Sequence, residues 1–239
     1  MNILLTGGTS GLGKNLVNLL AKESENTVLF TYCHNKQAAE ELVLTYSNVR
    51  PYHVDYTDMN SVDEFTSFLI SEQIDVLVNN AYTGNPQGTN FHKTPIDDFE
   101  KAYRENVIPL IKVTQACIAG MRKRKFGKII NILTSYLIDL PPAGFSVYTT
   151  TKACVRQLSK SISKEYARLN ITSNCVLPEY MATGFGDVGE YQTAQMLASH
   201  PLKELLKPED VAHIVCNIIH SSQQLNGVEI PINAAQHIM

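Results

Sequence analysis

The chain alternates between short strand-like apolar runs and helical patterns along its whole length. The last helical pattern has apolar residues at i, i+3, i+4, i+7 and i+8 and begins at a proline followed by two acids. Strands that alternate with helices pair in parallel through right-handed crossovers, so the order predicts an α/β fold with helices on both faces of the sheet. The strand-like runs lie near 2–6, 27–32, 49–54, 74–79, 128–134, 171–177 and 228–232, and the helical patterns near 12–22, 36–46, 61–72, 97–124, 146–169 and 208–221.

Composition places this fold in one ordinary globular domain. A length of 239 residues suits a single domain, 1–239, with a sizeable core, and no linker or repeat interrupts it. The net charge of −3 gives no reason to expect nucleic acid or an anionic membrane as a partner. No signal segment or spanning run is evident. The five cysteines lack Cys-x-x-Cys spacing, so we expect reduced thiols, no metal site and a cytoplasmic protein.

A glycine-rich turn follows the first strand-like run and leads into a helical pattern. Its glycines are Gly7, Gly11 and Gly13. Glycines allow a tight turn and a close approach of the backbone, and the helix N-terminus offers free N–H groups to a phosphate. A tight turn without a ligand is the alternative. Its place between a strand and a helix favours a site for a dinucleotide pyrophosphate.

A tyrosine and a lysine four residues apart form the second functional pattern. Tyr148 and Lys152 share one face if their segment is helical. A tyrosine normally ionises near pH 10, and a nearby ammonium lowers that pKa. We therefore expect a phenol that can transfer a proton near neutral pH, as general acid–base catalysis requires.

Together, Thr6-Gly7-x-x-x-Gly11-x-Gly13 and Tyr148-x-x-x-Lys152 resemble the short-chain dehydrogenase/reductase family in its single-domain form. The resemblance covers nearly the whole chain, and further matches occur in the family's order. It implies a Rossmann-type doubly wound parallel sheet of about seven strands and an NAD(P)-dependent oxidoreductase, similar in type to 3-oxoacyl-(acyl-carrier-protein) reductases. The further matches are Asp55, Asn79-Asn80-Ala81, Asn106, Ser135 and Pro178-x-x-Met181-x-Thr183.

The resemblance also implies catalytic roles. Tyr148 would give its proton to a carbonyl oxygen, and Lys152 would lower the tyrosine pKa and bind the nicotinamide ribose. Asn106 would hold a water that connects Lys152 to solvent. Ser135 would hold the substrate oxygen. Thr134 and Ser146 are alternative hydroxyls, and the thirteen-residue offset from the tyrosine favours Ser135.

The cofactor site implied by the same resemblance extends over several strand ends. The second strand is followed by no acid that would bind a ribose 2′-OH, whereas His34 and Lys36 could neutralise a 2′-phosphate. This favours NADP(H) over NAD(H), and hence reduction. The expected cofactor residues are Gly7, Thr9, Ser10, Gly11, Leu12, Gly13, Tyr32, His34, Asn35, Lys36, Asp55, Tyr56, Asn79, Asn80, Ala81, Tyr148, Lys152, Pro178, Met181 and Thr183.

Two departures from the family pattern bear on the substrate. Tyr82 and Glu179 stand where the family usually has glycine, so we expect both, with Ser135 and Tyr148, to contact the substrate or its surroundings. The segment 184–200 is expected to form a mobile lid. The substrate would be a small carbonyl compound or alcohol, with a carrier-protein-bound thioester docked at Lys123 and Arg124 as one alternative.

Two further expectations concern partners and activity. The family resemblance implies a homo-oligomer, a tetramer or a dimer, built through the helices near 97–124 and 146–169. A protein that keeps the fold but serves as a cofactor sensor or scaffold is the alternative to an enzyme. The complete set of Asn106, Ser135, Tyr148 and Lys152 favours the enzyme.

Overall fold

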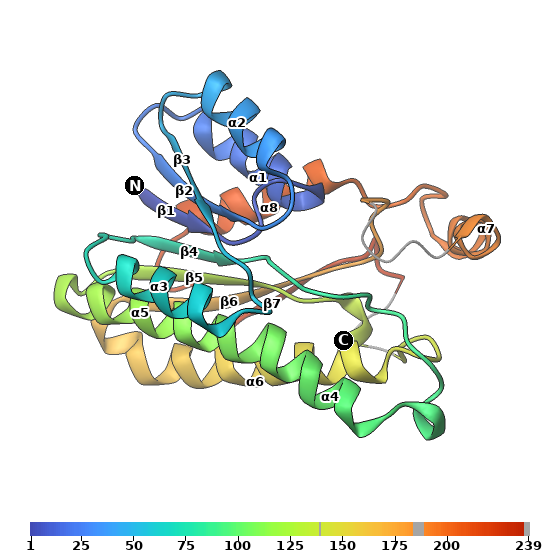
Figure 1. Cartoon of the computed structure of the whole chain (residues 1–239). Coiled ribbons are helices and arrows are strands. Elements are labelled where there is room, and N and C mark those ends of the chain that lie inside the picture. Colours follow the sequence, from blue (N-terminus) through green and yellow to red (C-terminus); the bar gives the residue numbers. More distant parts are fainter. Residues whose placement is uncertain (139, 184–188, 237–239) are drawn as a thin grey trace.

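The computed structural model describes residues 1–138, 140–183 and 189–236. Seven strands alternate with helices, as the sequence pattern predicts (Figure 1). The strands are β1 (Asn2–Leu5), β2 (Thr27–Tyr32), β3 (Val49–His53), β4 (Val76–Asn79), β5 (Gly127–Ile132), β6 (Ile171–Pro178) and β7 (Glu229–Ile232). The α-helices are α1 (Gly11–Ala21), α2 (Lys36–Thr45), α3 (Met59–Leu69), α4 (Ile96–Ala102), α5 (Ile108–Arg124), α6 (Ser146–Tyr166), α7 (Gly189–Ser199) and α8 (Pro208–His220).

All seven strands belong to one parallel sheet in the order β3-β2-β1-β4-β5-β6-β7. The chain starts in the middle, builds outward to β3, and then returns to the other side of β1 to build outward again. This order confirms the doubly wound Rossmann-type fold. In such folds the ligand crevice opens where the two halves diverge, at the carboxyl ends of the strands.

Helices cover both faces of the sheet, and each layer encloses its own apolar core (Figure 1). On one face α1 and α8 pack over β1 with buried residues such as Leu16 and Val215. On the other face α3, α5 and α6 pack over β4 and β5 through residues such as Phe65, Val113 and Ile162. Because both faces are covered, the central strands read as continuous apolar runs.

The region expected to be one long helix, 97–124, is divided by a π-helical turn at Tyr103–Val107. Pro109 follows that turn and has no N–H to donate to the preceding turn. The Asn106 amide donates to the Ala102 carbonyl over 3.1 Å within the same region. π-helical turns of this kind are frequent at functional sites.

Two other expected segments take defined forms. Within the expected lid 184–200, residues 189–199 form α7, which stands apart from the sheet in Figure 1, and residues 184–188 lie outside the described residues. The basic run Arg122–Arg124 occupies the last turn of α5, where cationic side chains compensate the helix dipole. Arg124 also donates to the Ile74 carbonyl.

Thr6, directly after β1, fastens the two halves of the sheet at the crevice. Its hydroxyl accepts the N–H groups of Asn80 at 2.9 Å and Ala81 at 3.0 Å, immediately after β4. The Asn80 amide in return donates to the carbonyls of Thr6 and Gly7, both at 3.0 Å. A buried side chain thereby fixes the loop after β1 against the loop after β4.

We expect Thr6→Val to destabilise the protein by about 1–3 kcal/mol, because two partly buried N–H groups lose their acceptor while the side-chain volume stays the same. Urea unfolding followed by circular dichroism measures the change. Thr45→Val is the matched control, since the Thr45 hydroxyl is exposed and donates only to the Glu41 carbonyl within α2. Equal stability of the two variants would contradict the role given to Thr6.

Candidate active site

One cavity of about 660 Å³ lies at the carboxyl ends of the strands, at the divergence of the two halves of the sheet. Its size falls in the range of sites for cofactors and other small molecules. Segments far apart in sequence meet there, namely the turn after β1, the ends of β2, β3 and β4, the segment after β5, the start of α6 and the segment after β6.

The glycine turn has the geometry that a dinucleotide pyrophosphate needs. Gly7 and Gly11 have φ of +73° and +48°, a region that favours glycine. A Cβ on Gly13 would lie 1.8 Å from the Gly7 carbonyl oxygen, so only glycine permits this close turn. Because α1 begins at Gly11 and the turn lines the cavity, the helix N-terminus and its N–H groups serve the same site. The residues present therefore fit the phosphates of a dinucleotide.

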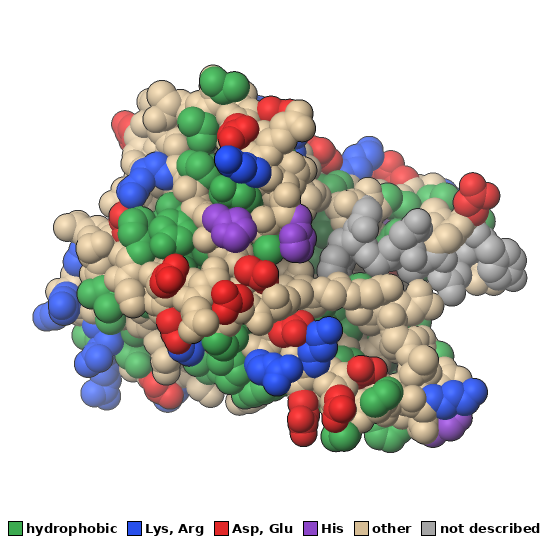
Figure 2. All heavy atoms as spheres, in the orientation of Figure 1, with side chains coloured by type: hydrophobic (Ala, Val, Ile, Leu, Met, Phe, Trp, Pro, Cys, Tyr) green, Lys and Arg blue, Asp and Glu red, His purple; other side chains and the backbone are tan. Residues whose placement is uncertain are grey.

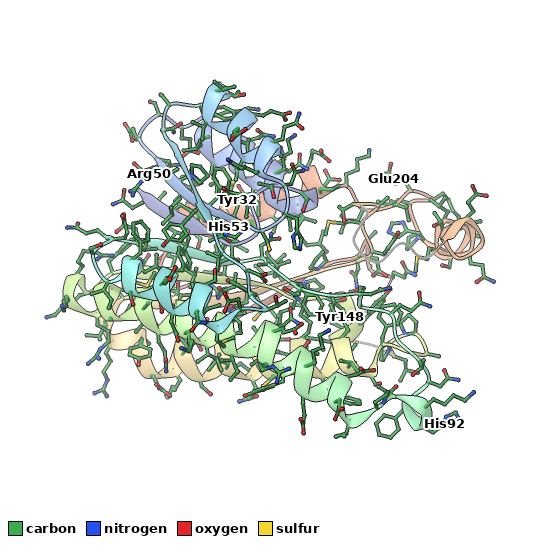
Figure 3. All side chains as sticks on the ribbon, viewed as in Figure 1. Tyr32, Arg50, His53, His92, Tyr148 and Glu204 are labelled. Carbon is green, nitrogen blue, oxygen red and sulfur yellow. The ribbon has the colours of Figure 1, made fainter. Side chains whose placement is uncertain are left out.

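The far end of the cavity is lined by the segment after β2 and by Asp55. The Asp55 carboxylate accepts the Thr57 hydroxyl and N–H at 2.7 and 2.8 Å, and these hydrogen bonds, with His34 and His53 nearby, lower the pKa of Asp55. In Figure 2 histidine side chains lie on this face, with acidic side chains below them. Figure 3 shows His53 beside Tyr32, and their rings are 5.5 Å apart.

Lys36, expected at this end, does not line the cavity. Its ammonium lies 3.5 Å from Glu40 in an exposed pair within α2. His34 and Asn35 do line the cavity, and the Asn35 side chain also caps α2 by accepting the Ala38 N–H. The i,i+4 pair with Glu40 thus holds the Lys36 ammonium along α2 and away from the cavity. The position of Lys36 just after a strand gives no sign of this pairing.

Tyr148 and Lys152 meet in the middle of the cavity, one turn apart on α6. Both are buried, and the ammonium lies 5.7 Å from the Tyr148 ring centre and 5.2 Å from that of Tyr82. The ammonium donates to the Ile132 carbonyl, at the end of β5, over 2.8 Å. The Tyr82 and Tyr148 rings pack edge to face at 5.1 Å. In Figure 3 Tyr148 lies near the strand ends, on the side where α7 projects.

Burial controls how both groups titrate. Burial first, and then the neighbouring Tyr82, raise the pKa of Tyr148 above its ordinary value, and a hydrogen bond with Thr134 acts in the opposite sense. Burial lowers the pKa of Lys152 to about 8. The expected lowering of the tyrosine pKa by the lysine is therefore wrong for the cofactor-free protein. Desolvation disfavours the charged form of each group and outweighs their mutual effect.

The hydroxyl beside Tyr148 belongs to Thr134, whereas Ser135 faces elsewhere. Thr134 lines the cavity and forms a hydrogen bond with Tyr148. Ser135 is fully buried, does not line the cavity, and donates its hydroxyl to the Glu179 carboxylate at 2.9 Å. The sequence offset pointed to Ser135. The structure instead places Thr134 there, at the N-cap of the short 3₁₀ turn Ser135–Leu137.

Two expected asparagines lie behind the cavity. Asn79 donates to Asn131 at 2.9 Å and to Thr114 at 3.2 Å, which links β4 to β5 and α5. Asn106 accepts the Thr83 N–H at 2.6 Å and donates to the Thr83 carbonyl at 3.2 Å. Both line a separate void of about 10 Å³ that also touches Lys152. Such a void is about the size of one water molecule.

Most expected site residues meet at the main cavity. Lys36, Asn79, Asn106 and Ser135 do not line it. Sequence patterns missed the aromatic residues Tyr136, Phe145 and Tyr180, whose only signal is that they occur in segments just after strands or before α6. The expected residues that line the cavity are Gly7, Thr9, Ser10, Gly11, Leu12, Gly13, Tyr32, His34, Asn35, Asp55, Tyr56, Asn80, Ala81, Tyr82, Tyr148, Lys152, Pro178, Glu179, Met181 and Thr183.

Residues 1–190 match the family model described as short chain dehydrogenase. The chain belongs to the short-chain dehydrogenase/reductase family, and it is an NAD(P)-dependent oxidoreductase of that type.

Relatives with assigned activities agree with this family. A 7alpha-hydroxysteroid dehydrogenase from Bacteroides fragilis is 30% identical over 217 residues, 88% of this chain and 83% of that protein. The 3-oxoacyl-(acyl-carrier-protein) reductase FabG from Aquifex aeolicus is 30% identical over 223 residues, 89% and 87% of the two chains. Among solved structures, YwfH, an NADPH dependent reductase involved in bacilysin biosynthesis, shares the fold with a TM-score of 0.87, 20% identity and coverage of 100% and 98%.

Other kinds of site are not evident in the described residues. Over ranges 1–138, 140–183 and 189–236, no three His, Cys, Asp or Glu side chains are grouped to hold a metal ion. None of the helices described combines the length and the apolar character needed to cross a membrane.

The buried lysine predicts a specific dependence of stability on pH. Between about 8, the pKa of folded Lys152, and its ordinary value of 10.5, the unfolded chain binds more protons, so stability rises with pH. We expect Lys152→Met to be more stable than the wild type at pH 7 by about 1 kcal/mol or more, and to lose this part of the rise between pH 8 and 10. Urea unfolding of the cofactor-free proteins from pH 7 to 10 measures both effects.

Lys22→Met is the matched control, because Lys22 is exposed at the end of α1. We expect its stability curve to run parallel to that of the wild type. A Lys152→Met curve that is also parallel would show that the ammonium is not desolvated.

Proposed function

We propose that this protein is an NADP(H)-dependent reductase that converts a ketone to a secondary alcohol, with Tyr148 as general acid. The observation that carries the proposal is one cavity that contains both the glycine turn and the buried Tyr148–Lys152 pair. A dinucleotide held by the turn would extend along the cavity toward that pair. The nicotinamide, when bound, supplies the hydride.

Tyr148 can act as the acid in the reductive direction. A tyrosine phenol is protonated at neutral pH and burial raises its pKa further, so the hydroxyl carries the proton that a carbonyl oxygen needs. The Thr134 hydroxyl, hydrogen-bonded to Tyr148, lies where it can hold the same oxygen. We therefore assign to Thr134 the role first expected of Ser135.

Lys152 holds positive charge beside the phenol and can restore its proton. Its pKa of about 8 leaves it mainly protonated at pH 7. The small void between Lys152 and Asn106 gives room for one water, which would carry protons from the Thr83 region to the lysine. Asn106, fixed on both sides by Thr83, would position that water.

The preference for NADP(H) rests on the end of β2. No carboxylate occurs from Tyr32 to Lys36, and His34 lines the cavity there. A relative in fold from Burkholderia cenocepacia, 21% identical with a TM-score of 0.86 over 98% of this chain and 96% of its own, has been solved in complex with NADP. With Lys36 paired to Glu40, His34 and Asn35 remain as the groups that would face a 2′-phosphate.

The remaining expectations fit the same proposal. One sheet with helices on both faces supports a single domain over 1–239. The expected substrate lid, 184–200, includes α7, which projects on the side of the strand ends in Figure 1. The ketone class includes the 3-oxoacyl thioesters named for several relatives. A cytoplasmic homo-oligomer, tetramer or dimer, is in keeping with the family.

The proposed function is tested by NADPH oxidation in the presence of a panel of ketones, with NADH in parallel. We expect Tyr148→Phe to lower kcat by about 10²-fold to 10⁴-fold, because the proton donor is lost, while NADPH binding measured by cofactor fluorescence stays unchanged. Tyr46→Phe, remote from the cavity, is the matched control.

Full turnover by Tyr148→Phe would rule out its role as the acid. Tight NADPH binding by the wild type without turnover of any ketone would favour the sensor or scaffold. Tighter binding of NADH than of NADPH would reverse the cofactor preference.

Variants of Thr134 and Ser135 show which of the two hydroxyls holds the substrate oxygen, the one favoured by the structure or the one favoured by the sequence. We expect Thr134→Val to lower kcat by about 10²-fold, since one hydrogen bond to the reacting oxygen is lost at constant side-chain volume. Ser135→Ala should change kcat for a neutral ketone by less than about threefold, because its hydroxyl is bonded to Glu179. Steady-state kinetics of both variants with the same ketone decides, and the opposite order would restore Ser135 as the catalytic hydroxyl.

A further inference from the structure

Glu179 places a carboxylate in the cavity directly after β6. It follows Pro178, and its backbone N–H donates to the Ile232 carbonyl at 3.0 Å, which fixes it against β7. Its side chain accepts the hydroxyl of the fully buried Ser135 at 2.9 Å through one carboxylate oxygen, Oε2. A buried serine thus holds the carboxylate in one position within the site.

Among the residues that the structure describes, no cation, whether Lys, Arg or His, pairs with the Glu179 carboxylate. Two cations follow Lys152 on the next turns of α6, namely Arg156 and Lys160. Both pair with Glu229, at 2.5 and 2.8 Å. A partly buried carboxylate is stabilised by a cationic partner, so a cationic ligand group would complement this charge.

Aromatic rings surround the same part of the cavity. Tyr136 lies 5.4 Å from Phe145, Phe145 lies 6.3 Å from Tyr148, and Tyr148 lies 5.1 Å from Tyr82, measured between ring centres. Burial, together with Glu179 and Tyr180 nearby, raises the pKa of Tyr136 to about 12, so this ring is neutral beside the carboxylate. Aromatic faces attract cations, and Lys152 already lies over two of these rings.

We propose that Glu179 and the rings of Tyr136 and Tyr180 bind a cationic nitrogen of the substrate, so that the ketone reduced here is an amino ketone. The inference rests on the proposed reductase function and names its substrate class. Neither a steroid skeleton nor an acyl thioester carries a cationic nitrogen in the part that reacts, so this substrate differs from those named for the relatives.

A matched pair of ketones tests the cation site. The 1,1-dimethyl-4-oxopiperidinium ion and 4,4-dimethylcyclohexanone have the same shape and differ by one permanent positive charge. With wild-type protein and NADPH we expect kcat/KM to be about tenfold higher for the cation. Calorimetric titration of the cofactor-free protein with each ketone gives a second readout that needs no turnover, and we expect the same order of Kd values.

Glu179→Gln removes the charge but keeps an acceptor for Ser135. We expect the tenfold preference, taken as the ratio of the two kcat/KM values measured with this variant, to fall to about one. Glu204→Gln is the matched control, because Glu204 is exposed and pairs with Lys207 at 3.5 Å outside the cavity (Figure 3). It should keep the wild-type preference.

Each result decides the matter. Equal kcat/KM and Kd for both ketones in the wild type, or a preference that persists in Glu179→Gln, overturns the cation site. A loss of NADP⁺ affinity relative to NADPH in Glu179→Gln, with the ketone ratio unchanged, also overturns it, because the carboxylate would then face the oxidised ring. A calorimetric preference for the cation without oxidation of NADPH supports the cation site and refutes the reductase.

Discussion

The pairing of β1 with both β2 and β4 determines where every functional group can lie. The sheet grows in two directions from β1, so the segments after β1 and after β4 separate there and open a crevice. The Thr6 hydroxyl joins the two segments at the base of the crevice by accepting the N–H groups of Asn80 and Ala81. A parallel sheet then brings the remaining loops to the same edge, because all of its strands end there. The arrangement of the site residues therefore depends more on this edge of the sheet than on any single side chain.

Features that follow from local patterns of residues could be predicted from the sequence. Features that depend on the exact residue at which a strand ends or a turn begins could not. The strands, the glycine turn and the Tyr148–Lys152 pair follow from patterns of apolar residues, glycine and i,i+4 spacing. The choice between Thr134 and Ser135 depends on where β5 ends and a 3₁₀ turn begins, and neighbouring hydroxyls give no signal of that boundary. The π-helical turn at Asn106 and the pairing of Lys36 with Glu40 likewise depend on contacts made only in the folded chain.

The direction of the pKa shifts shows how burial and charge compete at this site. Two opposite tendencies were available to Tyr148, a lowering by the ammonium and a raising by desolvation, and the second dominates. The same desolvation brings Lys152 close to titration near pH 8. A polar ligand group that reached the ammonium would stabilise its charged form and raise that pKa, since opposite or hydrogen-bonding partners favour the charged state. Ligand binding and the protonation of the pair are therefore coupled.

Glu179 and Ser135 are best understood together. A serine next to Thr134, the proposed catalytic hydroxyl, could compete for the substrate oxygen, but the Glu179 carboxylate accepts the hydroxyl of Ser135 and holds it behind the cavity wall. Loss of that carboxylate would leave a fully buried hydroxyl without its acceptor, at a cost of about 1–3 kcal/mol. The glutamate at position 179, where the family usually has glycine, and the position of Ser135 outside the cavity thus depend on the same hydrogen bond. Through it, the residues proposed to recognise the substrate are separated from Thr134, Tyr148 and Lys152, the residues proposed to act on the carbon–oxygen bond.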